Sequence, residues 1–388
     1  MPRVLGVDPG TKTFDIVVVD DDGVVKAEKS LETSMIAKDP NVLINAIKSF
    51  EIDYIAAPSG YGVPVTRGDE VVDPRRFAVE VLLLSTEDDI RRGVEAGEAG
   101  IWVYDALAKA VEYLVNNFGP RVIFLPGVIH LSTVPWYRKI NKVDMGTVDK
   151  LAASFLATHT YAVREGIDYD KVNIVVSELG FGYNAAMAIK DGKVVDGVGG
   201  TNASIGTLTA GALDLEVVAH VSSWERWDVF HGGIFYYANN YDLNEYAKAY
   251  EQGIEPLASL FRSFVEDVAK DISRMLVSTP KAEAVLLTGR HSRNKTLVSL
   301  LQDFIRDYEV RPVELLPGAS FSKEAAQGYA AIGEGLTGGA FRELVKHMEI
   351  EGACGTVADY LIHERLKEFK QRVIKSYMET VKTPRMCK

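Results

Sequence analysis

The chain has 388 residues, of which 47% are hydrophobic and 25% are charged. This length suggests two domains, and this composition is that of an ordinary globular protein. The formal net charge of -11, from 43 basic and 54 acidic residues, argues against a nucleic acid as the main partner. The two cysteines, Cys354 and Cys387, lie so far apart that they indicate neither a disulfide framework nor a zinc site.

The chain shows no apolar run long enough to span a membrane, and its first residues enter a strand without a signal peptide. We therefore expect a cytoplasmic protein that acts on a small-molecule substrate. Neither a membrane nor a nucleic acid is expected as a partner. A homodimer is compatible with the sequence, which leaves the oligomeric state open.

The first local pattern is an apolar run from Val4 to Val7 that ends in Asp8 and a glycine loop. A second strand of β-branched residues follows and leads to an Asp-Gly turn, so the pattern predicts a hairpin. Gly10 lets backbone N–H groups approach an anion closely, and Asp8 suits a magnesium ion held through water. The loop offers further donors from the side chains of Thr11, Lys12 and Thr13.

The same order of features returns in the second half of the chain. Strand 174–177 ends in Glu178, a glycine loop follows, and a second strand leads to another Asp-Gly turn. Laid over the first copy, Asp8 falls on Glu178 and Gly10 falls on Gly180. Such internal repetition predicts two like domains that face each other across a cleft. The loop also fits a dinucleotide-binding signature, but a hairpin rather than a helix follows it, which argues against that fold.

A strongly polar segment, residues 136–150, precedes a helix that is expected to run to about residue 164. One interpretation is that Asp144 or Thr147 caps this helix. The other is that Asp144 lies in the cleft as a general base, with Arg138 or Lys142 facing phosphate. Arg67 follows a Gly- and Pro-rich loop and is either solvated or in contact with an anionic substrate.

Two further loops of the second half are candidates for ligand contact. Residues 198–207 contain Gly200 and Thr201 and either touch phosphate or only connect two strands. A strand over 282–288 runs into Gly289 and Arg290 before the next helix, which puts backbone donors at the cleft. The aromatic-rich segment 222–241 packs as core or interface, or walls a substrate pocket.

The last third of the chain predicts a strand over 313–318 and a helix of small residues over 324–334. A mostly helical, basic tail follows from 341 to 382, with a break near Gly352 and Gly355. The seven histidines form no metal-ligand pattern, and no Walker A motif is present.

These motifs occur in the order seen in the acetate and sugar kinase/Hsp70/actin superfamily, which the chain resembles from Val4 to about Gly339. The second hairpin looks most like those of acetate and butyrate kinases, and the whole chain is similar to a family of predicted butyrate kinases. The resemblance implies an α/β fold of two ribonuclease-H-like, actin-like domains that flank an interdomain nucleotide cleft and close on ATP and Mg²⁺. It implies a first domain at 1–165 with an insertion around 58–100, a second domain at 166–339, and a helical extension at 340–388.

The resemblance also implies roles for individual residues. Asp8 and Glu178 would orient the metal ion, and Asp8, Glu178, Asp144 and Arg138 form the candidate catalytic set. The expected nucleotide-binding residues are Gly10, Thr11, Lys12, Thr13, Gly180, Phe181, Gly182, Gly200, Thr201, Gly289 and Arg290. Acetate and butyrate kinases usually carry His where this chain has Glu178 and Asn where it has Asp8. The two acids look more like the sugar-kinase arrangement, so the phosphoryl chemistry is kept while the acceptor differs.

The predicted activity is transfer of the γ-phosphoryl group of ATP to a small metabolite, with a short-chain carboxylate as the first acceptor class. An alcohol acceptor would need a general base, for which Asp144 is the candidate. Two alternatives remain, a nucleotide-binding ATPase switch and a resolvase-like nuclease. The nuclease is suggested by residues 6–11, but the acidic charge balance disfavours it.

Overall fold

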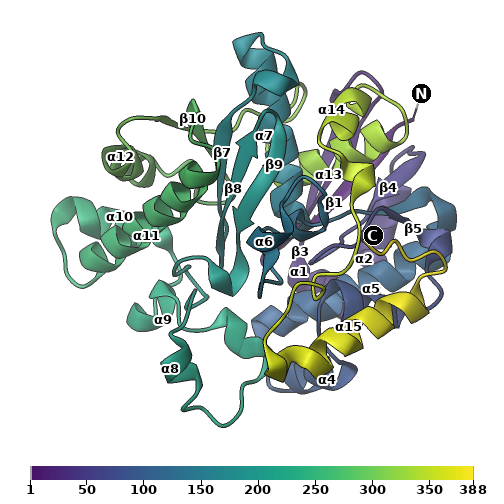
Figure 1. Cartoon of the computed structure of the whole chain (residues 1–388), viewed down its shortest axis with the longest axis horizontal. Coiled ribbons are helices and arrows are strands. Elements are labelled where there is room, and N and C mark those ends of the chain that lie inside the picture. The colour runs from purple at the N-terminus through teal and green to yellow at the C-terminus, as the bar shows by residue number, and fades with distance from the viewer. Residues whose placement is uncertain (1, 388) are drawn as a thin grey trace.

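The computed structural model describes residues 2–387 and contains two mixed sheets, each with helices packed around it (Figure 1). The first sheet has the strand order β3-β2-β1-β4-β6-β5, and the second has the order β11-β10-β7-β8-β9. In each sheet a hairpin is flanked by a parallel neighbour: β1 pairs with β2 and β4, and β7 pairs with β8 and β10. The expected α/β fold of two like lobes is confirmed.

The strands are short and match the two predicted hairpins. The first lobe has β1 (Val4–Pro9), β2 (Thr13–Val19), β3 (Val25–Glu32), β4 (Tyr54–Ala56), β5 (Thr66–Arg67) and β6 (Val122–Phe124). The second has β7 (Ile174–Leu179), β8 (Asn184–Lys190), β9 (Lys193–Val198), β10 (Ala284–Thr288) and β11 (Glu309–Pro312). The strand expected over 313–318 is wrong. The chain leaves the ladder after Pro312, and the N–H of Leu316 donates to the Gln327 side chain instead.

The helices that precede β7 in the chain are α1 (Thr33–Lys38), α2 (Asn41–Lys48), α3 (Pro74–Arg76), α4 (Glu87–Glu95), α5 (Ala99–Phe118), α6 (Trp136–Lys139) and α7 (Val148–Glu165), of which α7 packs on β7 and β8 of the second sheet. Those that follow are α8 (Leu215–Val218), α9 (Ile234–Ala238), α10 (Leu243–Gln252), α11 (Leu257–Ser278), α12 (Lys295–Phe304), α13 (Glu324–Leu336), α14 (Arg342–His347) and α15 (Lys367–Thr380). Residues 33–48 and 243–278 each form two helices rather than one. Pro40 and Pro256 lie at these breaks, because proline cannot continue a helix that precedes it.

The lobes meet where α7 and α13 pack against each other. Gly328 of α13 lies on the backbone of α7, so that an added Cβ would come 2.0 Å from the Ala152 carbonyl oxygen. Gly6 of β1 is equally close to α13, with an added Cβ 2.4 Å from the Ala330 nitrogen. The small residues of α13 therefore allow this helix to contact both α7 and β1 directly.

The C-terminal tail returns to the first lobe, where α15 lies beside the α4–α5 region (Figure 1). The N–H of Val72 donates to the Thr380 carbonyl at 2.8 Å, and a second backbone bond joins Lys382 to Glu70. Cys354 and Cys387 are joined by a disulfide, which their spacing in the sequence did not indicate. The tail folds back until the Gly355 N–H donates to the Arg385 carbonyl at 2.7 Å, which brings the distant thiols together.

No helix among residues 2–387 is long and apolar enough to cross a membrane.

Candidate active site

The tips of both hairpins line one cleft of about 220 Å³ between the lobes. Register explains part of this arrangement, because Glu178 lies next to Thr288 at the carboxyl ends of two parallel strands. Most of the residues that the sequence singled out lie in the cleft wall: Asp8, Gly10, Thr11, Lys12, Asp144, Glu178, Gly180, Phe181, Gly182, Gly200, Thr201, Gly289 and Arg290. The repeated hairpins thus face each other as the repeat predicts.

The tip of the first hairpin is held by a lysine from the second half of the chain. Lys323 Nζ lies 3.4 Å from both Asp8 Oδ2 and Asp15 Oδ2, and it donates to the Thr13 carbonyl at 3.1 Å. An added Cβ at Gly10 would come 2.5 Å from that Nζ, so the absence of a side chain at Gly10 leaves room for the lysine. Thr13 itself lies outside this cleft, in an adjoining hollow that Lys323 also lines.

The tip of the second hairpin carries Glu178 against two glycines. An added Cβ would come 3.0 Å from Glu178 Oε1 at Gly180 and 2.7 Å from the same atom at Gly289. Burial raises the pKa of Glu178 to about 7, and the Asp8 charge adds to this shift. The two tips are therefore within electrostatic reach of each other.

A lysine of α7, the helix that packs on β7, lies beside this tip. Lys150 Nζ lies 2.6 Å from Asp149 Oδ2 and 3.6 Å from Glu178 Oε2. Glu178 Oε2 nonetheless has no hydrogen-bond partner within residues 2–387, and neither does the buried hydroxyl of Thr288 beside it. Buried polar atoms are normally paired, so these two oxygens mark a place for a ligand.

Asp144 is the third acid of the cleft. Its Oδ1 accepts a 2.8 Å hydrogen bond from the Gly146 N–H, and an added Cβ at Gly200 would come 2.5 Å from its Oδ2. Burial raises its pKa to about 6. Asp144 does not cap the following helix, because Thr147 occupies the N-cap position of α7.

Arg138 is not brought into the cleft, contrary to the sequence-based expectation. Its guanidinium donates to the Val195 carbonyl at 2.8 Å and lies 3.7 Å from Asp196, both on β9. β9 lies at the edge of its sheet and offers these acceptors within reach of the short helix α6. The guanidinium of Arg138 therefore binds to β9 and not in the cleft. Arg67 also lies away from the cleft, over the ring of Tyr54.

Two of the cations that line the cleft converge on Phe181. Lys12 Nζ lies 4.1 Å from the centre of this ring, and the Arg290 guanidinium lies 6.0 Å from it. The two cations come from different lobes, and an anionic group between them would reduce their mutual repulsion. This end of the cleft suits a polyphosphate.

The sequence reasoning passed over the lysines that organise the site. Lys150 follows Asp149 in the first turn of α7, and Lys323 stands at the N-cap of α13. Lysine is uncommon at an N-cap, so Lys323 before a helix of small residues was a usable signal. Lys150 carried no such signal, because its partner Glu178 lies on a separate element, β7.

The opposite end of the cleft is apolar and aromatic. Its wall is formed by Tyr61, Leu83, Val103, Tyr104, Leu107, Tyr183, Val229 and Phe230. The last two belong to the aromatic-rich segment, which therefore walls the pocket in part. The hydroxyl of Tyr183 donates to the Val229 carbonyl at 2.6 Å. This end suits the carbon skeleton of a small acceptor.

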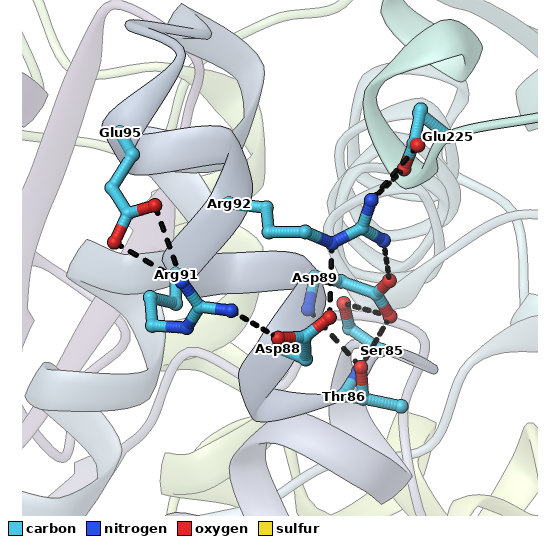
Figure 2. A network of polar contacts seen from close by, with 8 residues as sticks. All are labelled: Ser85, Thr86, Asp88, Asp89, Arg91, Arg92, Glu95 and Glu225. Carbon is cyan, nitrogen blue, oxygen red and sulfur yellow. Dashed lines mark hydrogen bonds and ion pairs between the residues drawn. The ribbon is translucent and has the colours of Figure 1, made fainter.

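Residues 225–231, which we call the clasp, join the second lobe to the first. Figure 2 shows Arg92 of α4 between Glu225 of the clasp and the acids of its own helix. Arg92 donates to Glu225 at 2.8 Å, and Glu98 lies 3.0 Å from His231. The clasp includes the 3-10 helix η7 (Arg226–Phe230) and closes over the apolar end of the cleft.

The acids of the cleft fit a magnesium ion brought by a nucleotide. Asp8 and Glu178 would hold it together with phosphate oxygens and water, since Mg²⁺ needs few protein ligands. When bound, the ion would neutralise phosphate charge. The one set of three acids that converges like metal ligands within residues 2–387 is Asp20, Asp21 and Asp22, in the turn between β2 and β3 and away from the cleft.

Solved structures of small-molecule kinases share this fold. The propionate kinase of Francisella tularensis aligns with a TM-score of 0.55 and 14% identity, over 85% of this chain and 98% of that chain. Acetate kinase from Entamoeba histolytica gives a TM-score of 0.54 and 14% identity, over 80% and 96%. Acetate kinase from Porphyromonas gingivalis gives 0.54 and 14%, over 85% and 98%.

These likenesses confirm the predicted α/β fold of two lobes, which is the fold of these kinases. The resemblance to the butyrate kinase branch stays a prediction. A family model described as "Protein of unknown function (DUF1464)" matches residues 6–363, which is most of the chain. The chain therefore belongs to the DUF1464 family.

Proposed function

We propose that this protein is an ATP- and Mg²⁺-dependent phosphotransferase that transfers the γ-phosphoryl group to a small metabolite. The observation that carries the proposal is the shared cleft of the two hairpin tips, with Asp8 and Glu178 facing each other across it. Glycine loops and the cations Lys12 and Arg290 supply the phosphate end. Kinases of this kind work chiefly by positioning and electrostatics, which such a cleft provides.

Two classes of acceptor are candidates. A short-chain carboxylate is the class predicted from the sequence, and acetate and propionate kinases are among the structural neighbours. A hydroxyl acceptor is favoured by Asp144, because a carboxylate with a pKa of about 6 suits a general base near neutral pH. A carboxylate acceptor needs no such base.

The experiment that tests the proposal measures ADP formation and acceptor phosphorylation from Mg-ATP, with Asp8→Asn and Glu178→Gln as variants. We expect both variants to lose magnesium-dependent turnover while their circular dichroism spectra stay unchanged. Full activity in both would remove the metal-orienting role and with it the proposed mechanism.

The alternative of an ATPase switch predicts a different result in the same assay. Such a protein would bind and hydrolyse ATP without passing the phosphoryl group to any acid or alcohol. Cleavage of branched DNA by the metal-loaded protein would instead support the nuclease, which the net charge of -11 disfavours.

A further inference from the structure

The apolar end of the cleft differs from the phosphate end in its charges. Of the cations that line the cleft, Lys150 is paired with Asp149, and Lys323 is paired with Asp8. Lys12 and Arg290 lie against Phe181 at the phosphate end. Asp144 faces the apolar end without a basic partner of its own.

One more cation lies just behind this wall. Arg226, at the start of η7, donates its Nη2 to the Tyr104 hydroxyl at 2.8 Å and the Tyr61 hydroxyl at 3.4 Å. The same nitrogen lies 3.2 Å from the Leu83 carbonyl oxygen. Both phenols line the cleft and accept from the arginine, and since one of the two hydroxyls donates to the other, the pair keeps one O–H free to donate to a ligand.

This guanidinium lacks the partner that an enclosed charge normally has. Its Nε is buried without a hydrogen-bond partner, and the groups around the side chain are neutral phenols rather than carboxylates. Enclosing an unpaired charge is costly, so charges in protein interiors are usually paired. An anionic group held by the two phenols would complete the set.

We propose that the acceptor is a small hydroxy acid, whose hydroxyl meets Asp144 and whose carboxylate is held by Tyr61 and Tyr104 in front of Arg226. This proposal rests on the proposed kinase function and names its substrate class. A plain carboxylate bound for phosphorylation would lie against Asp144 as a second anion. A neutral alcohol would leave Arg226 without a counter-charge.

The reaction step balances with the groups at hand. The acceptor hydroxyl gives its proton to the Asp144 carboxylate while its oxygen forms a bond to the γ-phosphorus of ATP. The bond between that phosphorus and the β,γ-bridging oxygen breaks, and ADP leaves with the electron pair. The product is a phosphate ester, not an acyl phosphate.

Arg226 acts through the two phenols and is thus a positioning residue. It reaches them from the second lobe, while Tyr61 and Tyr104 belong to the first. The ion pair of its neighbour Glu225 with Arg92 fixes the clasp on α4 (Figure 2). The recognition of the acceptor carboxylate is complete only when the clasp is seated on the first lobe.

The test compares three matched series as acceptors with Mg-ATP. The hydroxy acids are lactate, glycerate and 3-hydroxybutyrate, the plain acids are propionate and butyrate, and the neutral alcohols are 1,2-propanediol, glycerol and 1,3-butanediol. We expect kcat/KM for one hydroxy acid to exceed that of its acid and diol counterparts by about tenfold or more. Phosphorus NMR should show a hydroxylamine-resistant ester.

Each other outcome counts against the proposal. Preferred transfer to a plain acid or a neutral alcohol would overturn the hydroxy-acid assignment and leave the kinase function standing. An absence of transfer in all three series, from protein that binds Mg-ATP, would overturn both.

Variants separate the positioning role from a structural one. We expect Arg226→Met and the milder Tyr104→Phe to reduce the ratio of hydroxy-acid to diol kcat/KM by about tenfold, with the KM for ATP unchanged. Arg67→Met is the matched control, because Arg67 also lies over a tyrosine ring but outside the cleft. An equal loss for both acceptors in Tyr104→Phe would contradict the role.

Discussion

Asp8, Asp144 and Glu178 hold their protons more tightly than free carboxyl groups because the cleft shields them from water. Their pKa values rise to about 6, about 6 and about 7. The charge of Asp149 disfavours the ionised form of all three, the charge of Asp8 also acts on Glu178, and the nearby lysines offset only part of this effect. These buried acids suit a cation and proton transfer, and for the same reason they lower the stability of the ligand-free protein.

Glu178→Gln should therefore stabilise the ligand-free protein while it abolishes turnover. The folded pKa of about 7 exceeds the ordinary glutamate value of 4.5, so Glu178 loses its proton more easily in the unfolded chain. Its stabilising contribution is present below about pH 4.5 and is lost as the pH rises through 7. We expect the free energy of unfolding in urea to rise by about 1–3 kcal/mol at pH 8 and to change little at pH 4.

The exposed Glu351 provides the control for this comparison, since Glu351→Gln should leave the unfolding free energy unchanged at both pH values. If Glu178→Gln instead destabilises the protein at pH 8, the attraction between Lys150 and the Glu178 carboxylate exceeds the cost of burying that carboxylate.

Asp144→Asn should reduce phosphoryl transfer to a hydroxyl by about 10²- to 10⁴-fold, the usual contribution of a general base. In the unchanged protein, the rate should rise with pH through about 6, where the Asp144 carboxyl loses its proton. Steady-state rates between pH 5 and 8 check both expectations. Retention of most of the activity in Asp144→Asn, with Mg-ATP binding intact, would exclude the base.

At the scale of elements, the contact of α7 with α13 determines how the lobes meet. Gly328 and Ala152 touch through their backbones, so the two helices approach more closely than side chains would allow. α7 also carries Asp149 and Lys150 into the cleft, and Lys323 precedes the first turn of α13. The same pair of helices that joins the lobes therefore places both lysines.

Gly328→Ala should disturb this contact. The added Cβ would come 2.0 Å from the Ala152 carbonyl oxygen, which requires a shift of one helix. We expect a loss of about 1–3 kcal/mol in unfolding free energy, measured in urea. Gly352→Ala is the control, because its nearest neighbour would be at an ordinary 3.4 Å. Equal stability of the two variants would argue against a tight contact.

The sequence predicted those features that are local in the chain. Strand, acid, glycine and turn follow one another within about twenty residues, so both hairpins and their order could be found without coordinates. The pairs that join distant positions could not, because sequence separation says little about distance in space. Lys323 with Asp8, Arg226 with Tyr104, and Cys354 with Cys387 are of this kind. The prediction that Arg138 lies in the cleft was wrong for a related reason, because its acceptor on β9 is distant in the sequence.

At the scale of the whole molecule, several contacts join the lobes besides the connecting chain, among them the bonds of Lys323 to Asp8 and Thr13. Two others are the contact of α7 with α13 and the clasp on α4 and α5. An added Cβ at Gly100 of α5 would come 2.3 Å from the ring of Phe230, so the clasp fits closely against this helix. Access to the apolar end of the cleft depends on whether the clasp is seated.

Arg92→Met should loosen the clasp without unfolding either lobe. Its ion pair with Glu225 is partly exposed, so its loss has a small effect and shifts the open population by about twofold at most. Hydrogen exchange of residues 225–231 should be faster, and high salt should have the same effect in the unchanged protein. Arg91→Met is the matched control, because Arg91 pairs only with acids of its own helix (Figure 2). Equal exchange in both variants would mean that the ion pair does not hold the clasp.

The bare backbone contact of Gly328 with Ala152 has a mechanical consequence. No side chain separates α7 from α13 here, so the two helices have little room to slide along each other. The lobes therefore move most easily by a rotation about this contact, which we call the fulcrum. Figure 1 shows α4 and the loop that carries α8 at the opposite end of the molecule from the upper part of α7. A small rotation about the fulcrum therefore displaces α4 and the α8 loop by a larger distance than it displaces the helices at the fulcrum. A small rotation is thus enough to let a ligand enter.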